Sequence, residues 1–241
     1  MTPRGRWHRL PRDPSTTRQV RTWARAMLTP GAAAVLDTET TGLGDDARIV
    51  DIGVVDAATG IVLLSTLVNP GRPIPAEATA VHHIADADVV DAPSWGQVLS
   101  DLEATLGFRE IVAYHAAFDR ARVAGECAAH LRRSAELLRP DRWHCLLEAR
   151  SKWLSTTRRL PLTGPHRAAG DALAARDLLV HMSRGRGAQL MSHRMIGVLW
   201  TAVTRVDLSG DQHGNLGLDN PRPGPTPPRG VPGEARVSQG R

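Results

Sequence analysis

Residues 32–39 form a predicted buried strand that ends in two carboxylates. The apolar run Ala32 to Leu36 is followed at once by Asp37 and Glu39, which stand one residue apart. Side chains alternate between the two faces of a strand, so these carboxylates point to the same side. Like charges on one face repel, and burial strengthens the effect. The fold must therefore bring compensating positive charge to this strand end.

Two further acids and a histidine stand where they can meet this strand end. Asp119 lies just inside the helix that follows the predicted strand 110–115, and Asp171 lies one turn into the helix that begins near His166. In an α/β sheet these ends converge at one edge, and a cluster of carboxylates suits divalent cations, which prefer oxygen ligands. Two such ions about 4 Å apart suit in-line phosphoryl chemistry. Taken singly, each acid also fits a solvated face or a helix-end charge favoured by the dipole.

The hydrophobic pattern predicts an α/β domain with a mixed sheet. Strands are expected at 32–39, in a hairpin formed by 48–57 and 61–70, at 110–115, and as a short strand after Arg142. Helices are expected at about 15–28, within 76–90, at 94–107, 116–131, 166–183 and 192–205, and at the end of segment 142–154. Ser15, Thr16 and Thr17 are expected to cap the first helix, and its Val20, Trp23 and Met27 to pack on the main domain.

Three segments in fixed order resemble the DEDDh exonucleases of the ribonuclease H-like fold, the group of proofreading epsilon subunits, ribonuclease T and oligoribonuclease. These segments are LDTETTGL at 36–43, VAYHAAFD at 112–119 and HRAAGD at 166–171, with an epsilon-like linking segment at 68–95. The resemblance covers roughly residues 32–185. It implies a mixed five-stranded sheet flanked by helices, and a 3′-to-5′ exonuclease that releases nucleoside monophosphates from single-stranded DNA or RNA ends.

The resemblance also assigns a role to each motif position. Asp37, Glu39, Asp119 and Asp171 would hold two divalent cations, Mg²⁺ or Mn²⁺, with Asp37 bridging them. His166 would be the general base that takes a proton from the attacking water, a task that suits histidine. The 3′-terminal nucleotides would meet a further set of side chains, namely Thr40, Thr41, Leu43, His82, His115 and Phe118. Leu43 and Phe118 also fit plain core packing.

The chain departs from the family pattern at two positions. His115 stands where asparagine is usual, and His83 stands where glycine is common after His82. Neither is a metal ligand in the pattern. The first departure, together with the basic arms, motivates a second hypothesis: a weak or inactive nucleic-acid-binding or adaptor protein with the same fold. A small-oligonucleotide scavenger is a third reading, which the long arms disfavour.

Charge and composition bear on partners and location. The formal net charge is +5, and Lys152 is the only lysine, so the basic character comes from arginine. A basic balance suggests an anionic partner such as nucleic acid, although a coding bias toward arginine gives the same signal. Two cysteines that form no CxxC pair fit a reducing compartment. No apolar stretch spans a membrane and no secretory signal is present, so a cytoplasmic location is expected ahead of a mitochondrial transit peptide.

The expected organisation has four parts. Residues 1–31 form a basic arm and short helix, 32–185 the exonuclease domain, 186–208 a helical extension, and 209–241 a Pro/Gly-rich tail too poor in apolar residues to order itself. The two ends could tether a partner, such as a polymerase or another replication or repair protein, or track phosphates.

Overall fold

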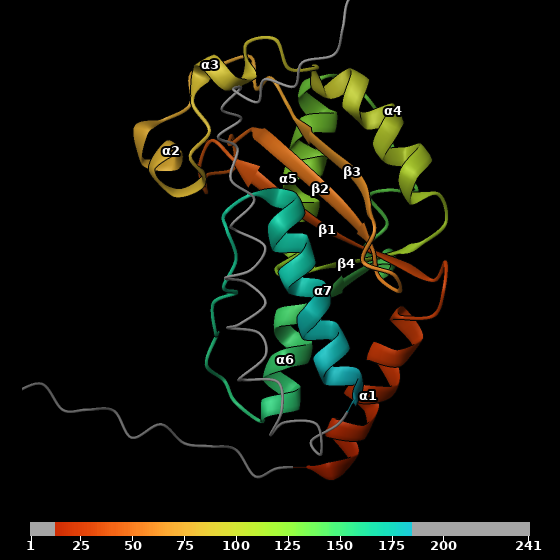
Figure 1. Ribbon diagram of the computed structural model, residues 1–241. Helices are drawn as coiled ribbons and strands as arrows, with labels where there is room; N and C mark the ends of the chain where they lie inside the picture. The colour runs from red at the N-terminus through yellow and green to blue at the C-terminus, as the bar shows by residue number, and fades with distance from the viewer. Residues whose placement is uncertain (1–12, 185–241) are drawn as a thin grey trace, which may run out of the picture. The chain divides into compact units, whose positions relative to one another are not determined.

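The computed structural model describes residues 13–184, which form a mixed five-stranded sheet with helices on both faces (Figure 1). The strands are β1 (Ala33–Thr40), β2 (Ile49–Asp56), β3 (Val62–Leu67), β4 (Glu110–Ala113) and β5 (Trp143–Cys145). The helices are α1 (Pro14–Met27), α2 (Ala76–His82), α3 (Asp86–Val89), α4 (Trp95–Leu106), α5 (Ala116–Ala129), α6 (Leu146–Leu154) and α7 (Ala168–Arg184), with a 3₁₀ turn at Pro140–Arg142. The predicted fold class is confirmed.

The strand order is β3-β2-β1-β4-β5, and the sheet changes direction at β1. β1 pairs antiparallel with β2 but parallel with β4, and β4 pairs parallel with β5. The carboxyl ends of β1, β4 and β5 therefore lie at one edge of the sheet. The segments that follow these strands carry the first two motifs and the start of α6.

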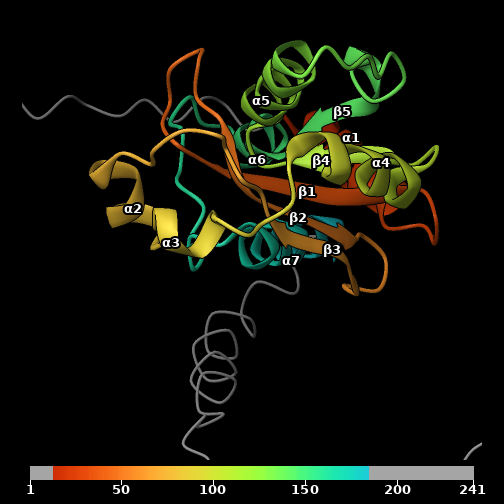
Figure 2. The same ribbon diagram turned by 90° about the horizontal axis from the view of Figure 1, so that it is seen from above.

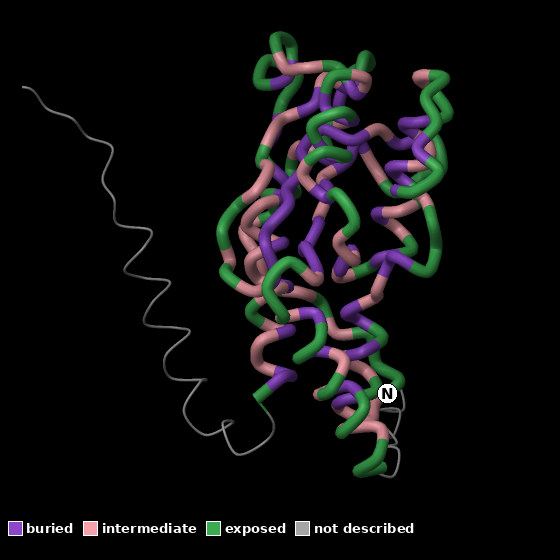
Figure 3. The backbone as a smooth tube through the Cα atoms, turned by 90° about the vertical axis from the view of Figure 1, so that its right-hand side faces the viewer, coloured by how far each residue is buried: buried purple, intermediate pink, exposed green. Residues whose placement is uncertain are grey.

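Helices lie on both sides of the sheet (Figure 2), and a separate apolar cluster fills the layer on each face. Ala34 and Leu36 of β1 pack in the layer with α4 and α5, whereas Ala33 and Val35 pack in the layer with α1, α6 and α7. Strands β1, β2 and β4 are largely buried, whereas the edge strand β3 is partly exposed, as are the loops and outer helix faces (Figure 3). Because side chains alternate along a strand, the residues that follow Leu36 in β1 also face the two layers in turn.

This alternation decides where the carboxylates of β1 point. Asp37 and Glu39 continue the series of Val35 and face the α7 layer, and Thr38 continues the series of Leu36 and faces the α5 layer. The expectation that the two acids share a face is met. Glu39 is paired in register with Asp51 of β2, and Asp37 with Gly53.

Among the element boundaries that differ from the sequence expectation, two have a clear local cause. The helix expected at 166–183 begins at Ala168, because His166 has a left-handed φ of 55° that a helix cannot continue through. The cap of α1 is Asp13 and not the Ser15–Thr17 run, because Pro14 takes the first helical position and the Asp13 carboxylate accepts the Ser15 N–H at 2.8 Å. The expected basic arm before residue 13, the helix at 192–205 and the tail at 209–241 lie outside the described residues.

Helix α1 packs along α6 and α7 with the face that its spacing predicts. Val20, Ala24 and Met27 are buried, and Trp23 lies against the same cluster. The Arg25 Nε donates to the Ser183 carbonyl near the end of α7 at 3.1 Å. Among the described residues, no helix has both the length and the apolar character that a bilayer crossing requires.

Gly53 allows the start of α7 to lie directly on the sheet. A Cβ at this position would stand 2.3 Å from the Ala169 nitrogen and 2.5 Å from the Ala168 carbonyl carbon, closer than any contact allows. A strand glycine of this kind marks a close approach of another backbone segment. Since Gly53 is the register partner of Asp37, the contact places the first turn of α7 beside the carboxylates of β1.

We expect Gly53→Ala to lower the free energy of unfolding by about 1–3 kcal/mol, the usual cost of forcing extra atoms into a packed interior. Gly125→Ala is the matched control, because Gly125 lies inside α5 and a Cβ there would meet nothing within 4 Å. Alanine favours helix, so the control should be neutral or stabilise by up to about 1 kcal/mol. Urea unfolding followed by circular dichroism compares the two; equal stabilities would contradict the close-contact explanation.

Candidate active site

Three of the four acids named by the sequence come from β1 and α5. Asp37 and Glu39 are half-buried at the carboxyl end of β1, and Asp119 is buried in the first turn of α5. The Thr38 hydroxyl donates to Oδ1 of Asp119 at 2.9 Å. Thr38, which lies between Asp37 and Glu39 but faces the other side of the sheet, therefore holds Asp119 in the layer of α5.

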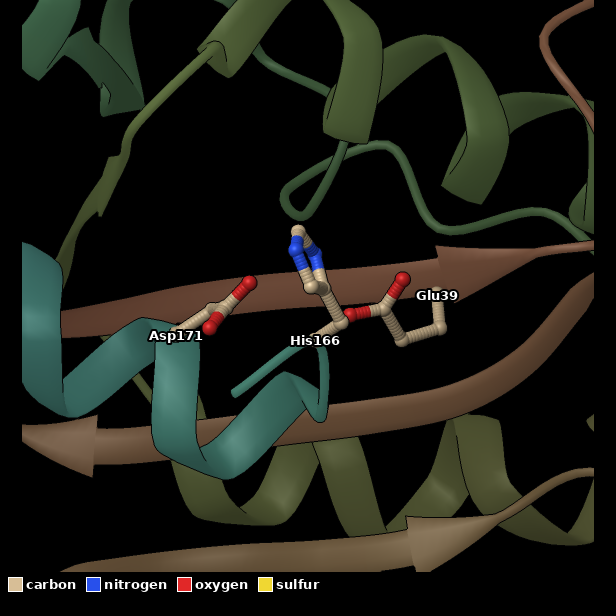
Figure 4. A group of neighbouring side chains, drawn as sticks. All are labelled: Glu39, His166 and Asp171. Carbon is tan, nitrogen blue, oxygen red and sulfur yellow. The ribbon is translucent and has the colours of Figure 1, made fainter. Parts of the chain in front are cut away.

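The start of α7 supplies the fourth acid and the histidine. Ligand atoms of Glu39, His166 and Asp171 all lie within 4.8 Å of one another, and His166 stands between the two carboxylates (Figure 4). Asp171 projects from the first turn of α7, while His166 precedes the helix and is exposed. Gly164 lies so close that a Cβ there would stand 1.8 Å from Oδ1 of Asp171, so any larger residue would displace this carboxylate.

All four acids have raised pKa values. Burial, then the charges of Asp119 and Asp171, hold the pKa of Asp37 well above its usual range. Burial and the charges of Asp171 and Asp51 raise the pKa of Glu39 to about 7. Burial also raises the pKa of Asp119, to about 7, and that of Asp171. Among the described residues, the cationic side chains near this edge of the sheet are therefore too few to neutralise the negative charge of the four acids.

These residues fit divalent metal ions. Oδ1 of Asp171 is buried and has no hydrogen-bond partner among the described residues. A carboxylate oxygen in that state costs free energy unless a cation approaches it. Four carboxylates form the oxygen donor set that Mg²⁺ and Mn²⁺ prefer. The donor chemistry and the orphaned oxygen agree with the ligand set that the motifs imply.

Asp51 is a residue of this site that the motif analysis did not find. It is 2% exposed, and its Oδ2 accepts the Arg167 Nε at 2.9 Å and the Ala168 N–H at 3.2 Å. The second bond satisfies a free backbone donor in the first turn of α7, where an anion is favoured. Asp51 thereby fixes the backbone next to His166. The sequence did carry a sign of this role, because Asp51 lies inside the apolar strand IVDIGVVD and a buried acid is costly unless it is paired.

The turn after β1 carries Leu43 into solvent. Leu43 is 85% exposed, whereas Thr40 and Thr41 are buried and bond within the turn. The Thr40 hydroxyl donates to the Gly42 carbonyl at 2.7 Å, and the Thr41 hydroxyl accepts the Arg48 N–H at 3.0 Å. These hydroxyls therefore shape the turn, and core packing is excluded for Leu43.

Arg122, which the motifs do not include, ties this turn to α5. It is 5% exposed and donates to the Gly44 carbonyl, and its guanidinium carbon lies 5.3 Å from the centre of the Phe118 ring. Phe118 is partly buried. One α5 arginine thus contacts both the turn that presents Leu43 and the aromatic ring of the second motif.

His82 lies inside the fold and His83 outside it. His82 is 2% exposed, its Nδ1 accepts the Ile84 N–H at 3.1 Å, and burial lowers its pKa, while the Thr40 carbonyl opposes that shift. His83 ends α2 with a left-handed φ of 61°. Glycine adopts that conformation without strain, which explains the family preference for glycine there. Histidine in place of glycine at position 83 therefore strains the local backbone, but its side chain does not reach the carboxylate cluster.

His115 precedes α5 and makes no side-chain capping bond. Its exposed ring lies parallel to Phe118, with ring centres 6.2 Å apart and an angle of 6° between their planes. In this chain α5 therefore begins without a side-chain cap, and His115 instead adds an aromatic ring at the surface. Asp119 keeps its bond to Thr38, so the change leaves the buried acid in place.

Comparison with known proteins agrees with this geometry. A family model described as exonuclease, RNase_T, matches residues 34–179, a span that contains all three motifs. The chain belongs to this exonuclease family. The resemblance drawn from the motifs is confirmed at that level.

Two relatives illustrate the extent of the similarity. Exodeoxyribonuclease 10 of Escherichia coli K12 is 32% identical over 193 residues, which cover 73% of this chain and 74% of that protein. Uncharacterized exonuclease CP81 of Escherichia phage 186 is 49% identical over 84 residues, 35% of this chain and 43% of the phage protein. The second match thus spans less than half of its relative.

The fold has counterparts among solved structures. The nuclease domain of 3′hExo, described as a DEDDh family member bound to rAMP, superposes with a TM-score of 0.52. The match covers 64% of this chain and 92% of that domain at 13% sequence identity. At this identity the similarity establishes the shared fold.

The raised carboxylate pKa values predict that metal-free protein loses stability as the pH rises. A folded acid with a raised pKa retains a proton that the unfolded chain releases. Its contribution to the free energy of unfolding is fully present below the pKa of the unfolded chain, near 4. That contribution is lost as the pH rises through the folded pKa, about 7 for Glu39 and Asp119. In chelator, thermal scans should show a lower Tm at about pH 7.5 than at about pH 5.

Asp37→Asn tests whether this loss comes from the cluster. The variant removes one negative charge from the cluster, so at about pH 7.5 in chelator its Tm should exceed that of wild type by roughly 2–5 °C. Added Mn²⁺ should raise the Tm of wild type more than that of the variant. If the variant melts below wild type in chelator at that pH, the carboxylates are not the source of the instability.

Proposed function

We propose that this protein is a metal-dependent 3′-to-5′ exonuclease that hydrolyses the last phosphodiester bond of a single strand and releases a nucleoside 5′-monophosphate. The family assignment supports exonuclease activity, and the three motifs support the direction and the metal dependence. The observation that carries the proposal is the position of His166, exposed between the carboxylates of Glu39 and Asp171. In that position the imidazole of His166 lies beside carboxylates that are suited to bind cations.

The four acids would hold the metal ions. In this proposal Asp37, Glu39, Asp119 and Asp171 bind two divalent cations, Mg²⁺ or Mn²⁺. When bound, such ions stabilise the charges of the entering and leaving oxygens in an in-line displacement. Two neighbouring residues keep the ligands in place: the Thr38 hydroxyl orients Asp119, and Gly164 leaves room for the Asp171 carboxylate.

His166 would act on the water that attacks the terminal phosphate. Its imidazole takes a proton from this water as the new phosphorus–oxygen bond forms. The bond to the 3′ oxygen of the preceding nucleotide breaks, and that oxygen takes a proton from solvent. Asp51 supports this step indirectly, because its bonds to Arg167 and Ala168 hold the backbone beside His166.

The strand end would rest on the exposed groups around the carboxylates. Leu43 projects from the turn after β1, and His115 and Phe118 form a parallel aromatic pair at the start of α5. Bases of any sequence can stack on such surfaces. The name of the Escherichia coli relative, exodeoxyribonuclease, favours DNA over RNA as the substrate. A polymerase or other replication partner is a further expectation from the sequence.

The alternative is a nucleic-acid-binding or adaptor protein without useful turnover. It was motivated by the basic arms and by His115, whose ring lies parallel to Phe118 while the bond between Thr38 and Asp119 is kept. All five positions of the motif set are filled, and four of the raised pKa values belong to them. This arrangement favours the enzyme.

The deciding experiment follows nucleotide release from labelled single-stranded DNA and RNA with Mg²⁺, with Mn²⁺ and with chelator. We expect shortening from the 3′ end only with metal, and faster on DNA. His166→Ala should lower the rate by about 100-fold or more, the usual contribution of a general base. Asp37→Ala should abolish release while binding of the strand is retained.

Asp101→Ala is the matched control, because Asp101 is an exposed acid on α4. It should cleave like wild type. Binding without release from folded wild-type protein, in either metal, would support the adaptor reading instead.

A further inference from the structure

The loop between α6 and α7, residues 155–167, carries His166 and is attached to the sheet near its middle. The Tyr114 hydroxyl donates to the Leu160 carbonyl. Nη1 of Arg150 donates to the same hydroxyl oxygen at 2.9 Å and to the Pro161 carbonyl at 3.1 Å. We refer to Tyr114 and Arg150, with these three bonds, as the loop clamp.

Tyr114 is itself held firmly. It directly follows β4, and its carbonyl accepts the Leu147 N–H at 3.0 Å in the first turn of α6. The Cys145 thiol lies 3.6 Å from the same oxygen. The ring is partly buried against the cluster that α1, α6 and α7 share with the sheet. The clamp therefore connects the loop to the parallel part of the sheet and not to a mobile side chain at the surface.

The other end of the loop is attached through Asp51. Its carboxylate binds Arg167 and Ala168, the two residues after His166. Between the two attachments lie only Leu162 to His166, and Pro161 and Pro165 restrict the backbone there. His166 has a left-handed φ of 55°, which a residue with a Cβ keeps only when its surroundings enforce it.

We propose that Tyr114 and Arg150 are positioning residues, which fix the loop so that His166 stays between Glu39 and Asp171. This inference rests on the proposed function, in which His166 is the base. Neither clamp residue is among the acids, the base or the stacking surface. A small displacement of the base lowers the rate of the chemical step without weakening the binding of the strand. The second-motif tyrosine thus acts through the loop of the third motif.

Tyr114→Phe tests the clamp, because it keeps the buried ring and removes the bonds of the hydroxyl. We expect kcat to fall between about ten-fold and a hundred-fold, while KM and the midpoint of the pH–rate profile stay close to wild type. Hydrogen–deuterium exchange should rise in residues 156–167 and stay unchanged in β1 and α5. A general loss of stability would instead raise exchange throughout the sheet.

Two further variants serve as controls. Thr157→Val removes an exposed hydroxyl from the same loop and should change neither kcat nor exchange. Arg150→Lys retains a cationic donor and should recover part of the activity and protection that Arg150→Met loses.

The exchange measurement separates the two proposals. If wild type releases no nucleotide, the proposed function fails, and increased loop exchange in Tyr114→Phe would still establish the attachment. If wild type is active and Tyr114→Phe matches it in both kcat and loop exchange, the clamp is overturned. Normal kcat with increased loop exchange also overturns the positioning role.

Discussion

Mutual repulsion among the four carboxylates at the end of β1 is the constraint that the rest of the structure must satisfy. Asp37, Glu39, Asp119 and Asp171 are brought together although burial raises the pKa of each. An isolated cluster of this kind would separate. The apolar layers on both faces of the sheet prevent that, because moving any of these acids apart would displace a strand or a helix that the layers bury.

The contact between β2 and α7 is where packing opposes this repulsion. Gly53 leaves room for the first turn of α7. Asp51, two residues before Gly53 on β2, accepts the Ala168 N–H at the start of that helix. The same face of β2 thus supplies both the space and the hydrogen bond. Functional sites commonly hold costly local arrangements that the surrounding structure enforces, and the left-handed His166 belongs to the same category.

The sequence predicted the elements and the shared face of Asp37 and Glu39 because these depend on local periodicity. It could not show that the hydroxyls of Thr40 and Thr41 bond within their own turn, since that depends on where the chain turns after Gly42. Asp51 and Arg122 were missed for a related reason. Their partners, at Ala168 and Gly44, are distant in sequence, and only the packed sheet brings them close. His115 could be recognised as a departure, but its parallel contact with Phe118 required the backbone of α5.

Helix α1 has a consequence for how this nuclease can be divided. The family match begins at residue 34, after α1 has ended, yet Val20, Ala24 and Met27 are buried against α6 and α7. A recombinant fragment cut at the family boundary would expose the apolar surface that these side chains cover, close to the helix that carries Asp171. Exposed apolar patches of that kind favour self-association. For expression, a fragment of this protein should therefore begin no later than Asp13, the cap of α1, whatever the extent of the recognisable exonuclease sequence.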